Sequence, residues 1–159
     1  MATKIRNCAR CGSAAEQKTL GRISAAEAPV KLHLTGFPVV ACAKNHHAPV
    51  HGDFMLWLIR ELREKCLPAV PAGEAKGMLF KKYSCACGAE LPPKPARSGV
   101  QAFELTFPDF PAFKTELEVA LYKCAGCGKE QARSAKELAG AMPEAVVALN
   151  DAAGFPHSG

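Results

Sequence analysis

The first half of the chain contains a segment in which hydrophobic and polar residues alternate, as they do in a strand with one buried face. Residues 30–35 (VKLHLT) are apolar at every second position. Residues 36–38 (GFP) are typical of a turn, and residues 39–42 (VVAC) are expected to form the return strand. Upstream, residues 24–27 (SAAE) have the spacing of a capping box and predict a short helical turn. This half is therefore expected to contain a β-hairpin.

The second half shows the same pattern over longer segments. Residues 100–107 alternate, with their apolar side chains on one face: Phe103, Leu105 and Phe107. Residues 108–111 (PDFP) turn the chain. Residues 115–122 alternate again, with Glu116 and Glu118 outward and these residues inward: Leu117, Val119 and Leu121. A second β-hairpin is expected here.

Each hairpin is followed by a segment with helical character. Gly52 and Asp53 supply a stop and an N-cap before a helix over residues 54–67. Its core stripe is expected to be Met55, Leu58, Ile59, Leu62 and Cys66, with Cys66 packed as a small apolar residue. Phe54 and Trp57 lie off this stripe. Either they fill a seam between the two halves, which we favour, or they form an exposed patch for a partner.

The C-terminal helix begins at a capping box formed by Ser134 and Glu137. Gly140 and Pro143 are expected to break this helix, with Pro143 opening a second helical piece through Asn150. Residues 68–77 are expected to be a linker, and residues 155–159 a frayed tail.

Seven of the eight cysteines fall in four short clusters: Cys8 with Cys11, Cys42, Cys85 with Cys87, and Cys124 with Cys127. Two cysteines separated by two residues and followed by Gly form a tight turn, a zinc knuckle, that aims both sulfurs at one point. Two such turns brought together by a hairpin make a tetrahedral zinc site. We therefore expect two zinc ions, one of them held by four cysteines.

The first site has three cysteines, so its fourth ligand must come from His46, His47 or His51. Aligning Cys42 with Cys124 places Asn45 where Cys127 lies, which makes the neighbouring His46 the first choice. His47 is nearly as suitable, and His51 more naturally starts the helix. A first site that has lost its metal is the remaining alternative.

Together these patterns predict an α+β chain with an imperfect internal repeat. Each of two zinc-ribbon-like modules would contain a knuckle, a β-hairpin, a second knuckle and a helix. The first module is expected over residues 1–67 and the second over residues 78–159, joined by the linker at 68–77.

This arrangement resembles the zinc-ribbon superfamily of zinc fingers, present as a tandem repeat. The resemblance is carried by the seven clustered cysteines with Gly12, Gly88 and Gly128. The layout is also similar to the zinc-binding half of antitoxins of the MqsA type, although no helix-turn-helix half is recognised. The resemblance implies a zinc-stabilised hairpin and leaves both protein and nucleic acid open as partners.

Composition adds expectations about compartment and charge. No signal peptide is recognised, and the longest apolar run, residues 54–59, is far shorter than the roughly 20 residues that cross a bilayer. We expect a cytoplasmic protein without membrane contact, in which close cysteines bind metal instead of forming disulfides. Seven ligating thiolates and two zinc ions lower the formal charge from +5 to about +2, a weak basis for binding nucleic acid.

The expected function is that of a non-enzymatic adaptor that contacts another protein, because no phosphate loop, nucleophile elbow or metalloprotease motif is found. One alternative is a nucleic-acid-binding ribbon with a stacking surface at Phe80, Tyr83 and Tyr122. Its basic residues would be Arg6, Arg10, Lys44, Lys81, Lys82, Lys123 and Lys129. Another is a metal-dependent enzyme using His47, His51 or Asp53, or a rubredoxin-like carrier with iron at the four-cysteine site. The oligomeric state stays open.

Overall fold

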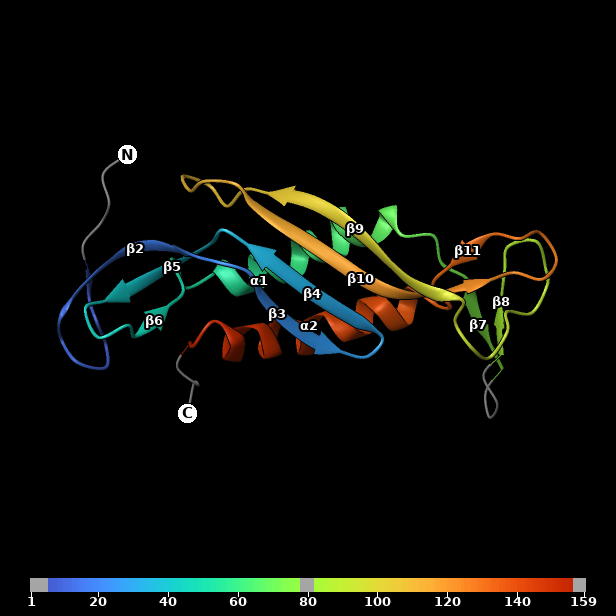
Figure 1. Cartoon of the computed structure of the whole chain (residues 1–159), viewed down its shortest axis with the longest axis horizontal. Helices are drawn as coiled ribbons and strands as arrows, with labels where there is room; N and C mark the ends of the chain where they lie inside the picture. Colours follow the sequence, from blue (N-terminus) through green and yellow to red (C-terminus); the bar gives the residue numbers. More distant parts are fainter. Residues whose placement is uncertain (1–5, 78–81, 156–159) are drawn as a thin grey trace.

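The two cysteine clusters belong to opposite ends of an elongated α+β molecule (Figure 1). The computed structural model describes residues 6–77 and 82–155. One end is built from a small antiparallel sheet with the strand order β1-β2-β5-β6. Its strands are β1 (Arg6–Asn7), β2 (Ala14–Leu20), β5 (Phe37–Cys42) and β6 (His47–Ala48).

The β2–β5 hairpin carries a second hairpin inserted at its tip, made of β3 (Ile23–Glu27) and β4 (Val30–Thr35). The predicted strand over 30–35 is confirmed, and the return strand begins at Phe37. The short helical turn predicted over 24–27 is wrong, because this segment is strand β3 and Ser24 pairs with His33. Pairing along the whole length of β4 supplies more backbone hydrogen bonds than one helical turn could.

The central sheet joins the two halves of the chain. Strand β10 (Phe113–Lys123) pairs with β9 (Arg97–Leu105) and also with β4, where Leu117 lies opposite Leu32. The end of β10 pairs with β11 (Glu130–Gln131). Two further strands, β7 (Glu74–Lys76) and β8 (Lys82–Ser84), form a ribbon beside the second cluster. The segment predicted as a linker, 68–77, thus contributes strand β7.

Two helices cover one face of the central sheet (Figure 1). Helix α1 (Phe54–Glu61) continues as a π-helical segment (Leu62–Cys66) and a 3₁₀ turn (Leu67–Ala69). Helix α2 (Ala135–Ala152) begins at the predicted cap, where the Ser134 hydroxyl accepts a hydrogen bond from the Glu137 N–H at 3.2 Å. No helix in the described part of the chain is long and apolar enough to span a membrane.

The predicted break in the C-terminal helix is wrong, because α2 runs without interruption through Gly140 and Pro143. A proline inside a helix costs one backbone hydrogen bond and crowds the preceding turn. In α2 this cost is offset by the face that the helix buries against the sheet and α1. That face consists of Leu138, Ala141, Met142, Ala145, Val146 and Leu149.

An aromatic cluster lies between the two halves. Phe54 is fully buried, and its ring centre lies 5.2 Å from that of Phe37 and 5.0 Å from that of Phe107. Trp57 also packs against Phe107, at 5.0 Å. Phe54 was wrongly excluded from the core stripe of the helix. Both rings fill a seam between segments from the two halves of the chain.

The C-terminal segment is ordered as far as Phe155, which is buried with its ring 6.1 Å from that of Phe37. The prediction that a frayed tail starts at this residue is therefore wrong. Phe155 is part of the core, and residues 156–159 lie outside the described residues.

Candidate metal centres

Four tight turns present the cysteines of the two clusters, and two of these turns share one design. The Gly12 N–H donates to the Cys8 carbonyl at 2.8 Å, and the Gly128 N–H donates to the Cys124 carbonyl at the same distance. Both glycines have a positive φ, 73° and 78°, which side chains rarely adopt. The glycine after each Cys-x-x-Cys sequence therefore closes the turn that brings its two sulfurs together.

The other two turns are one residue shorter. The Gly88 N–H donates to the Cys85 carbonyl, and the Asn45 N–H donates to the Cys42 carbonyl, both at 2.9 Å. Asn45 has a φ of 60° and replaces glycine here, as asparagine tolerates the left-handed conformation better than most residues. The Cys42 turn therefore matches the Cys85 turn, and the alignment with Cys124 used above is wrong for this turn.

The first cluster brings together Cys8, Cys11, Cys42 and His46, whose donor atoms all lie within 4.8 Å of one another. The Cys11 and Cys42 sulfurs are 3.7 Å apart, and the Cys8 sulfur is 3.5 Å from His46 Nδ1. In a tetrahedral zinc site, bonds of about 2.3 Å to sulfur and 2.0 Å to nitrogen place two sulfurs about 3.8 Å apart and a sulfur and a nitrogen about 3.5 Å apart. This cluster can therefore hold a metal ion without rearrangement of these pairs.

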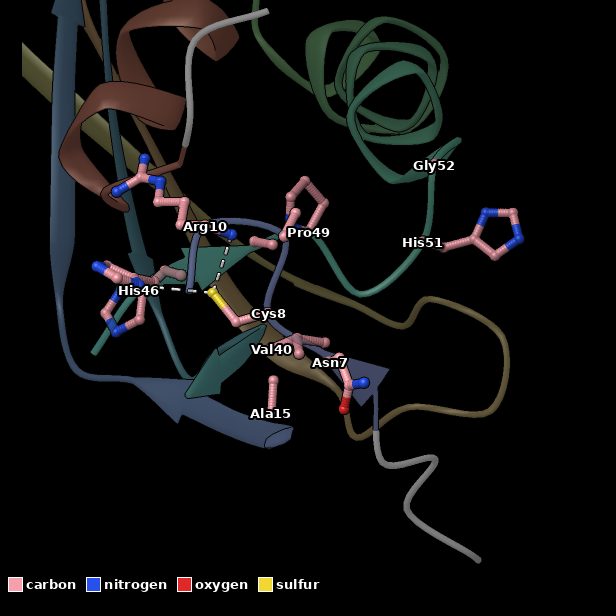
Figure 2. Close-up of a pocket in the computed structure, with 12 residues that line it drawn as sticks. Asn7, Cys8, Arg10, Ala15, Val40, His46, Pro49, His51 and Gly52 are labelled. Atoms are coloured by element: carbon pink, nitrogen blue, oxygen red, sulfur yellow. Dashed lines mark hydrogen bonds between the residues drawn. The ribbon is translucent and has the colours of Figure 1, made fainter. Parts of the chain in front are cut away.

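The other two candidate histidines point elsewhere. His47 Nδ1 lies 2.9 Å from the Ala153 carbonyl, which can only accept, so this nitrogen donates a hydrogen bond to the residue that follows α2. His51 is exposed, and its Nδ1 accepts a hydrogen bond from the Asp53 N–H at 3.1 Å. Figure 2 shows His51 directed away from Cys8 and His46. Of the three histidines, the structure brings His46 alone into the first cluster.

The second cluster consists of Cys85, Cys87, Cys124 and Cys127, with donor atoms again within 4.8 Å of one another. The sulfurs of Cys85 and Cys127 are 3.7 Å apart, and those of Cys87 and Cys124 are 3.5 Å apart. A disulfide requires about 2.05 Å, and none of the eight cysteines is in a disulfide. These separations fit the edges of a metal tetrahedron.

Hydrogen bonds to sulfur support the charged thiolates that a metal requires. The His46 N–H lies 3.4 Å from the Cys42 sulfur, and the Arg10 N–H lies 3.4 Å from the Cys8 sulfur. At the second cluster, the side-chain amide of Gln131 donates to the Cys85 sulfur at 3.2 Å. Sequence reasoning missed Gln131, because a glutamine in a two-residue strand carries no pattern that marks it as buried.

Hydrogen bonds also lower the pKa of a thiol in each cluster. The hydroxyl and backbone of Ser13, followed by His46 and Cys42, lower the pKa of Cys11 to about 6. The backbone N–H of Cys87 and the Gln131 amide lower the pKa of Cys85 to about 6. A thiolate is the form that binds metal, so both clusters offer a ligand that is already deprotonated at neutral pH.

A pocket of about 310 Å³ adjoins the first cluster (Figure 2). Cys8 and His46 form part of its wall, and Val40 and Pro49 are among its apolar lining residues. A second pocket, of only about 10 Å³, is lined by Tyr122, which packs with Cys85 and Cys124 of the second cluster. The two clusters thus share a donor geometry and differ in their surroundings.

Comparison of the chain with protein-family models, with curated proteins and with solved structures found no match. The functional assignment therefore depends on the geometry of the two clusters.

Proposed function

We propose that the chain binds two zinc ions, one at each end, as structural elements of a tandem zinc-ribbon protein. The observation that carries the proposal is the presence of two sets of four donors, three cysteines with one histidine and four cysteines, at tetrahedral spacing. Nitrogen and sulfur donors in this number are the ligands that structural zinc prefers. Cys8, Cys11, Cys42 and His46 would hold one ion, and Cys85, Cys87, Cys124 and Cys127 the other.

A structural role fits both clusters better than a catalytic one. A catalytic zinc keeps one position open for water or substrate, whereas each cluster here supplies four donors. The need for a stabilising metal ion is clearest at the second cluster. There, Cys85 and Cys124 belong to a small separate core with Leu91 and Tyr122. So small a core gains much of its stability from metal binding.

We propose further that the protein is a non-enzymatic adaptor that contacts another protein in a reducing compartment such as the cytoplasm. The most exposed large apolar side chains, Leu56 at 69 %, Val147 at 57 % and Val100 at 51 %, are positions that such a contact would cover. A metallated charge of about +2 adds no strong electrostatic preference for nucleic acid.

The aromatic side chains expected to stack on bases are not free to do so where the structure describes them. Tyr122 is buried. The ring of Tyr83 is covered by the Arg133 guanidinium at 4.6 Å, and its hydroxyl donates to Glu137 at 3.1 Å. Phe80 lies outside the described residues. These contacts favour the protein-binding proposal over nucleic-acid binding.

The first test is elemental analysis of the natively purified chain, which should find two zinc ions per chain. Iron at the four-cysteine site would instead give a red protein and support the electron-carrier alternative. The second test compares capture of native protein partners with binding of single-stranded nucleic acid at several salt concentrations. Tight nucleic-acid binding that falls steeply with salt would contradict the adaptor role.

A further inference from the structure

The four cysteines of the second cluster are unequally exposed to solvent. Cys87 and Cys127 are exposed residues at the end of the molecule, whereas Cys85 and Cys124 are buried at 5 % and 1 % exposure. The first cluster has no exposed cysteine, since Cys8 and Cys11 are half-buried and Cys42 is buried. A reagent from solution therefore meets the second cluster first, on its Cys87 and Cys127 side.

Gln131 adds a chemical difference to this steric one. Its side chain is buried at 1 % exposure in β11, whose backbone pairs with Tyr122 at the end of β10. From there its amide donates to the Cys85 sulfur at 3.2 Å. A hydrogen bond to a thiolate engages one of its electron pairs and lowers its nucleophilicity, so Cys85 is protected by both burial and hydrogen bonding.

We propose that the four-cysteine cluster is a modification site for soft carbon electrophiles of the α,β-unsaturated carbonyl class, that the reaction occurs at the exposed Cys87 and Cys127, and that Gln131 protects Cys85 from it. This inference rests on the proposed metal site. The thiolate adds to the β-carbon and a sulfur–carbon bond forms. The electron pair of the carbon–carbon double bond moves to the α-carbon, which takes a proton from water. The product is a neutral thioether, a weaker ligand than a thiolate.

The consequence would be a metal site that reports on electrophiles at one end of the protein while the other end keeps its ion. Cys8 and Cys11 are reached more slowly because they are half-buried, and a reagent meets Cys8 only from within the pocket beside it. Zinc release should therefore follow modification of the second cluster before that of the first.

The test treats the zinc-loaded chain with pulses of N-ethylmaleimide that increase from below one to several equivalents per chain, and maps the modified cysteines by mass spectrometry after each pulse. Cys87 and Cys127 should be modified first, and about one zinc ion per chain should be released before Cys8 or Cys11 reacts. Modification of Cys85 or Cys124 at the same rate as Cys87 would overturn the proposal. The zinc content measured before the first pulse tests the proposed function separately. A chain that holds two zinc ions but is modified in a different order contradicts this inference and leaves the proposed function intact.

The role of Gln131 is tested with Gln131→Met, which keeps the length of the side chain and removes the donor. Loss of one hydrogen bond should raise the rate at Cys85 about fivefold relative to Cys124. Gln101→Met, in β9 outside both clusters, is the matched control and should leave the ratio unchanged. An unchanged ratio in Gln131→Met would overturn the protecting role of Gln131. If this variant loses its zinc before the first pulse, the proposal is tested by the order in which the cysteines of the unmutated chain are modified.

Discussion

His46 Nδ1 and the Cys8 sulfur lie 3.5 Å apart, although the two residues belong to different turns and are 38 positions apart in the sequence. The Cys42 turn closes with Asn45 in the left-handed conformation, so the next residue, His46, leaves the turn facing the Cys8 side. This contact completes a set of four donors from three cysteines and one histidine.

His46→Ala should therefore reduce the zinc content from two ions to one per chain. His47→Ala and His51→Ala are the matched controls and should keep both ions, because their rings contact Ala153 and Asp53 instead of the cluster. Elemental analysis after a mild chelator challenge measures the difference. Retention of two ions by His46→Ala, together with loss from His47→Ala, would reassign the fourth ligand.

Cys124→Ser should release zinc from the second cluster and unfold the surrounding β7–β8 and β11 region. Binding energy at a structural zinc, on the order of 10 kcal/mol, is also folding energy. Cys66→Ala is a suitable control, because Cys66 is fully buried outside both clusters and burial raises the pKa of its thiol to about 11. The control should keep both ions. Equal zinc content and melting temperature in Cys124→Ser and the unmutated chain would contradict a structural site there.

Ser13→Ala should make zinc leave the first cluster at a higher pH. The Ser13 hydroxyl is the main cause that lowers the pKa of Cys11 from 9.0 to about 6. A thiol with a lowered pKa contributes stability that is complete above pH 9 and is lost as the pH falls through about 6. Removing the hydroxyl should raise the pH at which this stability is lost.

A zinc-release titration from pH 8 to pH 4 measures that shift. Ser24→Ala is the control, because Ser24 contacts His33 in the central sheet and no cluster residue. Coincident release curves for Ser13→Ala and the unmutated chain would show that the hydroxyl does not favour the thiolate.

Phe54→Ala should destabilise the whole chain by about 3–5 kcal/mol, because it empties the centre of the aromatic cluster. Leu56→Ala, two residues later and 69 % exposed, should change the free energy of unfolding by less than about 0.5 kcal/mol. Denaturant unfolding measures both. If Phe54→Ala unfolded only one half and left the other with its original midpoint, the two halves would be energetically independent.

The local features of the fold followed from the sequence because their causes are local. Alternation in residues 30–35 reflects one buried face, and the spacing of Cys124 and Cys127 reflects a single turn. The Ser134 cap depends on a contact with the residue three positions later. Each of these signals fits within a window of a few residues.

Features that depend on distant partners were missed. The pairing of β4 with β10 has no local signature, and without it β3 had no reason to be a strand. Continuous helix through Pro143 depends on the packing of the rest of α2, and the burial of Phe54 depends on rings from Phe37 and Phe113. The contact from Gln131 to Cys85 likewise appears only when β11 is placed beside β10.

The β4–β10 pairing also sets an order of events during synthesis. Val30 lies opposite Val119, so β4 leaves the ribosome long before its partner strand exists. Until then the nascent chain carries an open strand edge with three buried-type side chains, Val30, Leu32 and Leu34, and no covering helix α2. Such an edge can pair with the same edge of a neighbouring nascent chain. Early metal binding at Cys8, Cys11, Cys42 and His46 would reduce the number of conformations that compete with the native one. The zinc supply during translation should therefore affect the yield of soluble protein.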